Sequence, residues 1–293
     1  MNGLSAEGLA LTGAVLLAVG YGVLGALWLI PATRAIARDL ARVFFSATIV
    51  AVVLIAALLA GTAGLVLLMV AVSLRAGYEA GHVRLGAGRP AWGMAIVAFG
   101  VTAAAMAEPL AAVTLAGVWP LLLLRALMAR GGGTGRGLLD LLVFPVIPMA
   151  LLAHGLTAPE WRIASAGAYA LVEIFDSCAL LAGKLFGRRK AFPVLSPGKT
   201  VEGLIGGGLG LMALSAGGAV LLGLDGGALI LTASLVAGLA VAGDLAASRL
   251  KRMAGVKDYP VLMRRQGGVL DSLDSWIAAG AGLVALNIIL TWL

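Results

Sequence analysis

Long apolar segments separated by short polar ones fill most of the chain. A helix that crosses a bilayer needs about 20 mostly apolar residues, and ten segments approach or exceed that length. They are 8–30, 44–59, 62–74, 91–107, 110–124, 138–156, 161–183, 201–224, 228–247 and 276–293. The second and third belong to one apolar run that only Gly61 and Gly64 interrupt, so one long tilted helix is the alternative there. The pattern predicts an all-α, polytopic transmembrane helical bundle with nine or ten spans.

The composition supports a membrane protein and excludes several other classes. Hydrophobic residues make up 61% of the 293 residues and charged residues only 12%, against about 25% charged in an average soluble domain. A soluble fold of this size could not bury so much apolar surface, so the bilayer has to act as its solvent. The single cysteine, Cys178, excludes an internal disulfide and a cysteine-based zinc site.

The distribution of basic residues predicts how the spans are oriented. If the N-terminus is outside, every Lys and Arg except Arg162 falls in a segment on the cytoplasmic side, which agrees with the positive-inside rule. The net charge of +7 is then explained by cytoplasmic loops that lie beside anionic lipid head groups. No basic tail or aromatic platform indicates a nucleic-acid partner. The same topology places 184–200 and 248–268 on one face of the membrane.

The two parts of the chain differ in their polar content. Residues 1–137 form N-terminal transmembrane helices with short loops and almost no acidic residues within the spans. Residues 138–293 carry most of the candidate chemistry. We therefore expect a C-terminal catalytic transmembrane domain whose active-site loops, 184–203 and 244–275, face the cytoplasm.

Four carboxylates lie in or beside the spans, where a charge costs about 2.5–3.5 kcal/mol on insertion scales. Asp176 is in the middle of the seventh span, Asp244 is near the cytoplasmic end of the ninth, and Asp271 and Asp274 open the last. Each alone fits a structural role: a helix cap for Asp271 or Asp274, a surface ion pair for Asp244, a buried hydrogen bond for Asp176. Together, beside basic loops, they predict a site for a divalent cation and a polyphosphate.

Two polar segments carry features of phosphate sites. The first contains Lys251, Arg252, Lys257 and Asp258 and leads to the pair 267–268. Two consecutive glycines let backbone N–H groups approach a phosphate closely, and lysines supply point charges to neutralise it.

The second segment, 196–200, reads Ser-Pro-Gly-Lys-Thr and directly precedes a helix that we expect to begin near Val201. A helix N-terminus with adjacent hydroxyls and a lysine favours an anion. A plain N-cap at Thr200 explains the same pattern and is compatible with that role. The glycines at 206, 207, 208 and 210 predict close packing of this helix against another.

These residues together resemble the phosphatidate cytidylyltransferase family. Residues 248–274 follow the order and spacing of its signature, S-x-φ-K-R-x4-K-D and then G-G-φ-x-D-x-φ-D. Residues 196–203 resemble its S-P-K-K-T-x-E-G segment, and Asp176 with 183–187 resembles a family helix that ends in G-x-x-F-G. Gln266 stands where the signature has His, and Ser272 stands where it has Arg.

The resemblance implies Mg²⁺-dependent transfer of a cytidylyl group from CTP to phosphatidic acid, with CDP-diacylglycerol and pyrophosphate as products of a step in phospholipid biosynthesis. A second cation is left open, as is a homodimer. The expected location is the bacterial cytoplasmic (inner) membrane, with the lipid entering sideways from the inner leaflet. The attacking phosphate oxygen is already anionic, so no general base is required.

The resemblance also assigns roles to residues of this chain. We expect the catalytic group to be Asp271, Asp244, Lys251 and Lys257. The metal candidates are Asp244 and Asp271, followed by Asp176 and Asp274. The nucleotide phosphates are assigned to Lys199, Lys251, Arg252 and Lys257, with help from Ser196, Thr200, Gly267 and Gly268. Glu202 and Asp258 are expected to orient the basic residues.

Three alternatives stay open at this point. The substitutions at Gln266 and Ser272 favour keeping a related CTP-dependent enzyme with another lipid acceptor, such as an isoprenoid alcohol kinase or an archaeol-type cytidylyltransferase. A membrane transporter would use the intramembrane carboxylates as ion sites. An inactive homologue is the third alternative.

Overall fold

The computed structural model describes residues 5–128, 133–261 and 267–292. Almost all of this chain is helical. The helices are α1 (Ala6–Leu29), α2 (Arg34–Leu59), α3 (Gly61–Leu85), α4 (Arg89–Ala107), α5 (Pro109–Met128), α6 (Thr134–Leu141), α7 (Ile147–Thr157), α8 (Pro159–Phe186), α9 (Val201–Leu222), α10 (Gly226–Met253) and α11 (Val269–Trp292). The order is completed by four short elements: a 3₁₀-helix η1 (Pro31–Thr33), a π-helix η2 (Leu142–Val146), and the strands β1 (Lys190–Phe192) and β2 (Ser196–Thr200). The all-α fold class is confirmed.

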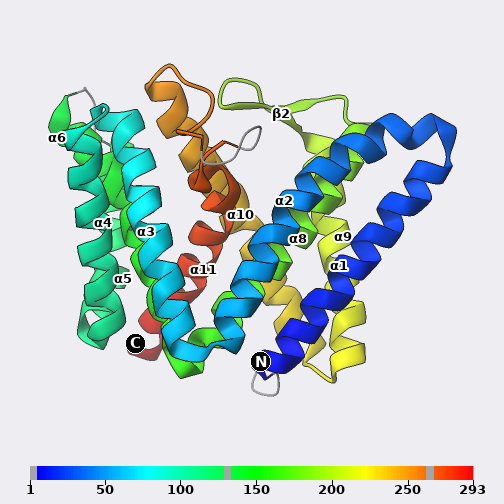
Figure 1. Cartoon of the computed structure of the whole chain (residues 1–293), viewed down its shortest axis with the longest axis horizontal. Coiled ribbons are helices and arrows are strands. Elements are labelled where there is room, and N and C mark those ends of the chain that lie inside the picture. Colours follow the sequence, from blue (N-terminus) through cyan, green and yellow to red (C-terminus); the bar gives the residue numbers. More distant parts are fainter. Residues whose placement is uncertain (1–4, 129–132, 262–266, 293) are drawn as a thin grey trace.

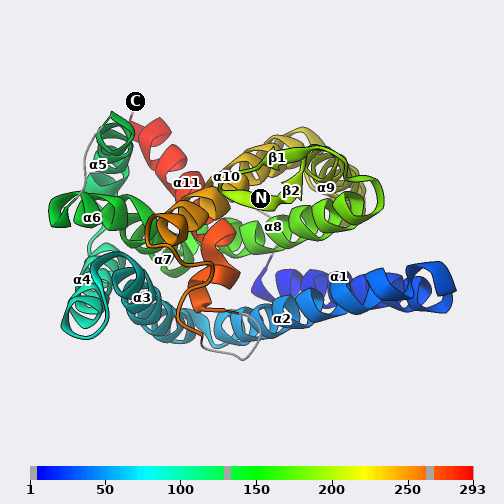
Figure 2. The same cartoon turned by 90° about the horizontal axis from the view of Figure 1, so that it is seen from above.

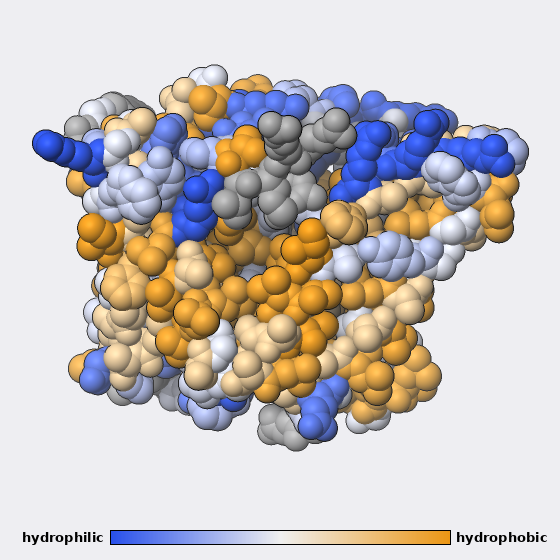
Figure 3. All heavy atoms as spheres, viewed as in Figure 1, coloured by the Kyte–Doolittle hydropathy of each residue, from blue (hydrophilic) through white to orange (hydrophobic). Residues whose placement is uncertain are grey.

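Ten helical segments of the described chain are long and apolar enough to cross a bilayer. On the face that Figure 3 shows, a broad hydrophobic band lies below an upper edge where most of the hydrophilic residues gather. That edge holds α6, the β1–β2 hairpin and the C-terminal end of α10 (Figure 1), and we call it the polar edge. The chain is an integral membrane protein.

The second and third predicted spans are two separate helices, so the described chain has ten helical segments capable of spanning, not nine. α2 ends at Leu59 and α3 begins at Gly61, whose φ of 74° is a backbone conformation that glycine adopts without strain. Both helices extend beyond the predicted apolar segments, to Arg34 at one end and to Leu85 at the other. The predicted span end at residue 74 is therefore too early, because α3 continues to Leu85.

The predicted span over 138–156 lies within one span-length helical segment, Gly135–Thr157, but its backbone is kinked into α6, η2 and α7. Phe144 has φ −156° and ψ 127°, which is extended backbone inside a helical segment. Pro145 follows it, and proline lacks the N–H that helical hydrogen bonding needs. The indole of Trp119 in α5 donates to the carbonyl of Val143 at 2.9 Å, which satisfies one group at the break.

α7 and α11 lie in the middle of the bundle. Every residue of α7 from Ile147 to Leu156 is buried. Viewed from above, α3, α5, α8 and α10 surround these two helices, whereas α1 lies at the periphery beside α2 (Figure 2). The buried core extends over both sides of residue 137, so the two parts of the chain pack on one shared core.

Close contact between α8 and α9 confirms the packing role expected for the glycines of α9. A Cβ on Gly207 would lie 2.8 Å from the Cβ of Ala179 and 3.0 Å from the carbonyl oxygen of Phe175. A Cβ on Gly210 would lie 2.6 Å from the sulfur of Cys178. A Cβ on Gly208 would meet nothing within 4 Å. One face of α9 therefore needs glycine for α8 to approach.

Candidate active site

The two predicted loops meet at the polar edge through one ion pair. Nζ of Lys199 in β2 lies 3.4 Å from Oδ2 of Asp244 in α10, and the side chains are 22% and 24% exposed. Oδ2 of Asp244 is buried and accepts no hydrogen bond from any described residue. Since the ammonium group is close but not hydrogen-bonded, this carboxylate oxygen keeps lone pairs available.

The short hairpin determines where Lys199 lies. β1 pairs antiparallel with β2, with Lys190 opposite Thr200 and Phe192 opposite Ser196. Thr200 then caps α9, as predicted, because its Oγ1 accepts a hydrogen bond from the N–H of Gly203 at 3.1 Å. Lys199 is consequently held between a paired strand and a capped helix start.

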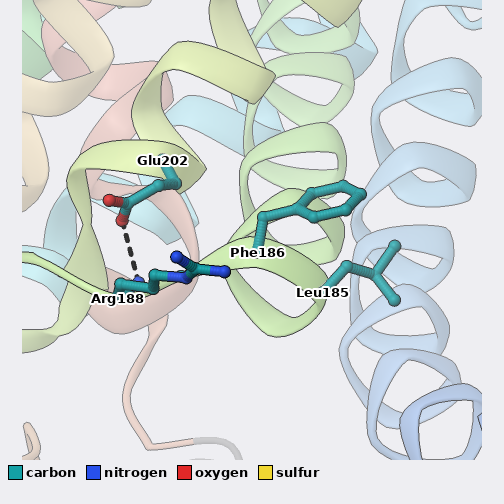
Figure 4. A pocket seen from close by; sticks show the side chains of 5 residues that line it. Leu185, Phe186, Arg188 and Glu202 are labelled. Atoms are coloured by element: carbon teal, nitrogen blue, oxygen red, sulfur yellow. Dashed lines mark hydrogen bonds between the residues drawn. The ribbon is translucent and has the colours of Figure 1, made fainter.

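Glu202 fastens the beginning of the hairpin to α9. Its Oε2 accepts from the backbone N–H groups of Arg188 and Arg189 at 3.0 and 3.1 Å, and its Oε1 accepts from Nε of Arg189 at 3.0 Å. Figure 4 shows the bond to Arg188. An open pocket of about 360 Å³ lies here, lined by Leu185, Phe186, Gly187, Arg188 and Glu202. None of the four predicted aspartates lines it, so this pocket is not where the aspartates gather.

Asp271 is the centre of a second group of contacts at the polar edge. Its Oδ1 accepts from Nζ of Lys251 at 2.5 Å, and its Oδ2 accepts from the backbone N–H groups of Tyr259 and Gly268, each at 2.9 Å. The Lys251 and Asp271 side chains are each 11% exposed. The ammonium group also lies 5.2 Å from the centre of the Tyr259 ring, a favourable cation–π geometry.

Tyr259 anchors the connection between α10 and α11 from inside. Its hydroxyl donates to the carbonyl oxygen of Ala247 at 3.3 Å, and its side chain is buried. Burial first, and then the charges of Asp274, Asp271 and Glu79, raise the pKa of the Tyr259 hydroxyl far above its ordinary value. Tyr259 therefore stays a neutral donor.

Asp176 and Asp274 lie near Asp244. Asp274 interacts electrostatically with both Asp244 and Asp176, and Asp176 also interacts with Lys199. α10 and α11 touch at this level, since a Cβ on Gly243 would lie 2.5 Å from the carbonyl oxygen of Asp274. The Asp274 side chain accepts from the N–H of Ser275 at 2.6 Å. Carboxylates from α8, α10 and α11 thus share one region.

The four aspartates do not form one closed cage. No group of three or more His, Cys, Asp or Glu in the described ranges has the arrangement of a metal site. Asp244 and Lys251 are separated by seven residues of one helix, about 10 Å along its axis. The Lys251–Asp271 pair therefore lies nearer the polar edge than Asp244, and the site has two levels.

The other predicted residues lie around this centre without joining it directly. Lys257 and Asp258 are exposed in the connection after α10. Arg252 is exposed, and its Nη1 donates to the carbonyl of Val256 at 2.9 Å. Ser196 is partly buried at the start of β2. Gln266 lies outside the described residues. The phosphate roles of these residues stay predictions.

The glycine pair approaches carboxylates in this structure. The N–H of Gly268 donates to Asp271, and a Cβ on Gly268 would lie 2.7 Å from the Cβ of Tyr259 and would collide with the carboxylate of Glu79. Gly267 has φ 78°, and a Cβ there would collide with the carboxylate of Asp271. Both positions therefore require glycine for close packing.

Glu79 and Arg75 of α3 also contact this region, although no sequence pattern marked them as site residues. Glu79 accepts hydrogen bonds from the backbone of Val269 and Leu270, 190 and 191 residues away along the chain. No periodicity or local motif predicts so distant a contact. The only signal was an acidic residue among apolar and small neighbours at the end of a span.

The fold and this site define the class: an integral membrane protein with one charged centre where α8, α10, α11 and the hairpin meet at the polar edge. The model of the Cytidylyltransferase family matches residues 40–290. The chain therefore belongs to that family.

Curated relatives agree with this assignment over part of the chain. The phosphatidate cytidylyltransferase of Haemophilus influenzae is 42% identical over 117 residues, which are 38% of this chain and 41% of that protein. The phosphatidate cytidylyltransferase of Pseudomonas aeruginosa is 40% identical over 126 residues, 41% of this chain and 46% of that protein. The uncharacterised protein YnbB of Escherichia coli is 43% identical over 37% of each chain. Each match spans less than half of the relative's length.

Proposed function

We propose that this protein transfers the cytidylyl group of CTP to phosphatidic acid. An anionic phosphate oxygen of the lipid attacks the α-phosphorus of CTP, the bond from that phosphorus to the bridging oxygen breaks, and pyrophosphate leaves. The observation that carries the proposal is the Lys199–Asp244 pair, which joins two family segments in one site. Membership of the Cytidylyltransferase family and the names of two curated relatives support it.

The reaction requires positioning and charge neutralisation more than proton transfer, because the nucleophile is already ionised. Lys199 and Lys251 are the basic side chains held closest to the carboxylates, and we assign them to the triphosphate. Lys257 and Arg252, which are exposed at the polar edge, are assigned to the approach of the nucleotide. Charges that are fixed in place stabilise a transition state without having to reorganise.

The residues present fit a Mg²⁺ ion. Oδ2 of Asp244 is buried without a hydrogen-bond partner in the described chain, and a hard cation favours such an oxygen. The side chains of Asp274 and Asp176 lie within electrostatic range of Asp244. Mg²⁺ is usually held by one or two carboxylates plus substrate phosphates, so a closed protein cage is not needed. The ion would neutralise charge on the triphosphate. Asp271 is a weaker candidate than Asp244 for binding Mg²⁺, because the Asp271 carboxylate oxygens already accept three hydrogen bonds.

An apolar groove supports sideways entry of the lipid. A cavity of about 210 Å³ lies between α2, α3 and α11, and it extends from Gly267 and Ser272 to Trp276. Leu68 and Val53 line its apolar part. An acyl chain in this groove would place the lipid phosphate beside Asp271 and Lys251. The positive-inside distribution supports an active site that faces the cytoplasm, in the inner membrane of a bacterium.

The test is purified protein in detergent with Mg²⁺, phosphatidic acid and CTP labelled either at the α- or at the γ-phosphorus. Cytidylyl transfer puts the α-label on the lipid and leaves the γ-label in pyrophosphate. Label from the γ-phosphorus on a lipid, or transfer only to polyprenol or archaeol acceptors, would replace the proposal by another CTP-dependent reaction. Absence of any labelled lipid with all acceptors would overturn it.

A further inference from the structure

Glu79 of α3 caps the first turn of α11 from another helix. Its side chain is fully buried, with 0% exposed. Oε1 accepts from the N–H of Val269 and Oε2 from the N–H of Leu270, both at 2.8 Å. The first N–H groups of a helix have no partner within the helix, and capping usually comes from a residue just before it. Here the cap comes from the N-terminal half of the chain.

Arg75, one turn earlier in α3, completes a two-residue clip. Its Nε donates to Oε1 of Glu79 at 2.6 Å, and its Nη2 donates to the carbonyl oxygen of Pro260 at 2.7 Å. The pair therefore holds the chain at Pro260 and again at Val269, on both sides of the glycine pair. A planar guanidinium can make these two bonds at once, which a lysine ammonium on a flexible stem does less well.

The clip contacts the neighbours of both backbone donors to Asp271. These donors are the N–H groups of Tyr259, beside Pro260, and of Gly268, beside Val269. A shift of either segment would move the Asp271 carboxylate, and with it the Lys251 ammonium that it binds. Glu79 thus affects the charged centre through backbone that it holds, and it is a positioning residue.

We propose that the Arg75–Glu79 clip positions Asp271 and Lys251 for the group transfer, so that α3 is part of the working site. The proposal rests on the proposed function for its kinetic part only. Burying a carboxylate is costly unless it is paired and hydrogen-bonded, and Glu79 meets that cost with bonds to α11 and Arg75. A clip that served only stability could contact any part of α11; this one contacts the turn that carries Asp271.

The first variant is Glu79→Gln, which keeps the size of the side chain and replaces one acceptor oxygen by an NH₂ group facing an N–H. We expect kcat to fall by about 100-fold, the effect of a small misplacement at a reacting centre, with the KM for CTP little changed. Arg75→Lys is the milder second variant, since it keeps the charge but weakens the contact with Pro260. Glu79→Asp, which is too short to reach both amides, should behave like Glu79→Gln.

The matched control is Asp140→Asn on the other side of α3. Nη2 of Arg84 in α3 lies 3.1 Å from Oδ2 of Asp140 in α6, and these side chains are 16% and 2% exposed. This pair is also buried, but it holds α6, and none of its hydrogen bonds within the described residues reaches α11. We expect Asp140→Asn to lower the unfolding temperature while kcat stays near the wild-type value. If Glu79→Gln lowers the unfolding temperature as much as Asp140→Asn does and leaves kcat unchanged, the positioning role is wrong.

Amide hydrogen exchange separates this proposal from the proposed function. In Glu79→Gln and Arg75→Lys the peptide that covers Val269–Leu270 should exchange at least about tenfold faster, whereas Asp140→Asn should leave it unchanged. This readout needs no substrate. If wild-type protein makes no CDP-lipid but exchange changes as expected, the proposed function fails and the clip stands. Unchanged exchange in both clip variants would overturn the clip itself.

Discussion

Lys199 and Asp244 approach to 3.4 Å although one lies in a hairpin before α9 and the other in the middle of α10. Lys199 belongs to a segment whose sequence predicts a phosphate site, and Asp244 belongs to the set of carboxylates that predicts a cation site. Their contact means that the two segments form one site. It also leaves Oδ2 of Asp244 as a buried acceptor with no hydrogen bond from the described chain, which is the feature that most favours a bound cation.

Replacing Asp244 by Asn should abolish most of the activity. The change removes one negative charge from the proposed cation site, and we expect kcat to fall at least about 100-fold at any Mg²⁺ concentration. A Mg²⁺ titration of the rate, with circular dichroism for folding, is the measurement. Asp225→Asn is the control, because Asp225 caps the opposite end of α10 through Ala228 and Asn caps as well as Asp. Full turnover by Asp244→Asn would remove this residue from the site.

Lys251→Met should cost stability as well as activity. It leaves the Asp271 carboxylate buried without its cation, and breaking one partner of such a pair costs about 3–5 kcal/mol. Adding Asp271→Asn removes the unpaired charge, so we expect the double variant to recover unfolding temperature but not turnover. Thermal unfolding in detergent and the CDP-lipid assay test both parts. Recovery of turnover in the double variant would make this pair purely structural.

Two neighbouring glycines of α9 should respond oppositely to alanine. Gly207→Ala puts a Cβ 2.8 Å from that of Ala179, so α8 and α9 have to separate, and overpacking of this kind costs about 1–3 kcal/mol. Gly208→Ala meets nothing within 4 Å and should be neutral or stabilising, by up to about 1 kcal/mol, through helix propensity. The unfolding temperatures of the two variants give the comparison. Equal destabilisation by both would contradict the packing described for α9.

Blocking the apolar groove should affect the lipid and not the nucleotide. Leu68 lines the groove, whereas its neighbour Leu67 is 72% exposed on the outer surface of α3. We expect Leu68→Trp to raise the KM for phosphatidic acid about tenfold, equivalent to about 1.4 kcal/mol, with the KM for CTP unchanged. Leu67→Trp should change neither. An increase in the KM for CTP alone would place the lipid elsewhere.

The positions of the membrane helices could be predicted from the sequence, because a bilayer requires long apolar segments. The residues at which these helices begin and end could not be predicted in the same way. Arg75 and Glu79 lie beyond the predicted end of a span at residue 74, and the last predicted span starts at residue 276, whereas α11 begins at Val269. Polar turns that project beyond the membrane lose the hydropathy signal, although protein contacts keep them helical. The break at Phe144 could not be predicted from Pro145, because proline is tolerated in membrane helices and does not by itself indicate a break.

The sequence by itself determined the bundle of membrane spans, the residues that carry charge at one edge, and the resemblance that led to the family. Hydropathy, charge bias and motif spacing are local properties, and each can be read along the chain. Only the tertiary structure decided which charges are neighbours: Lys199 with Asp244, Lys251 with Asp271, and Glu79 with the first turn of α11. These pairs depend on how ten helices pack, and packing brings together residues whose separation in sequence carries no local signal.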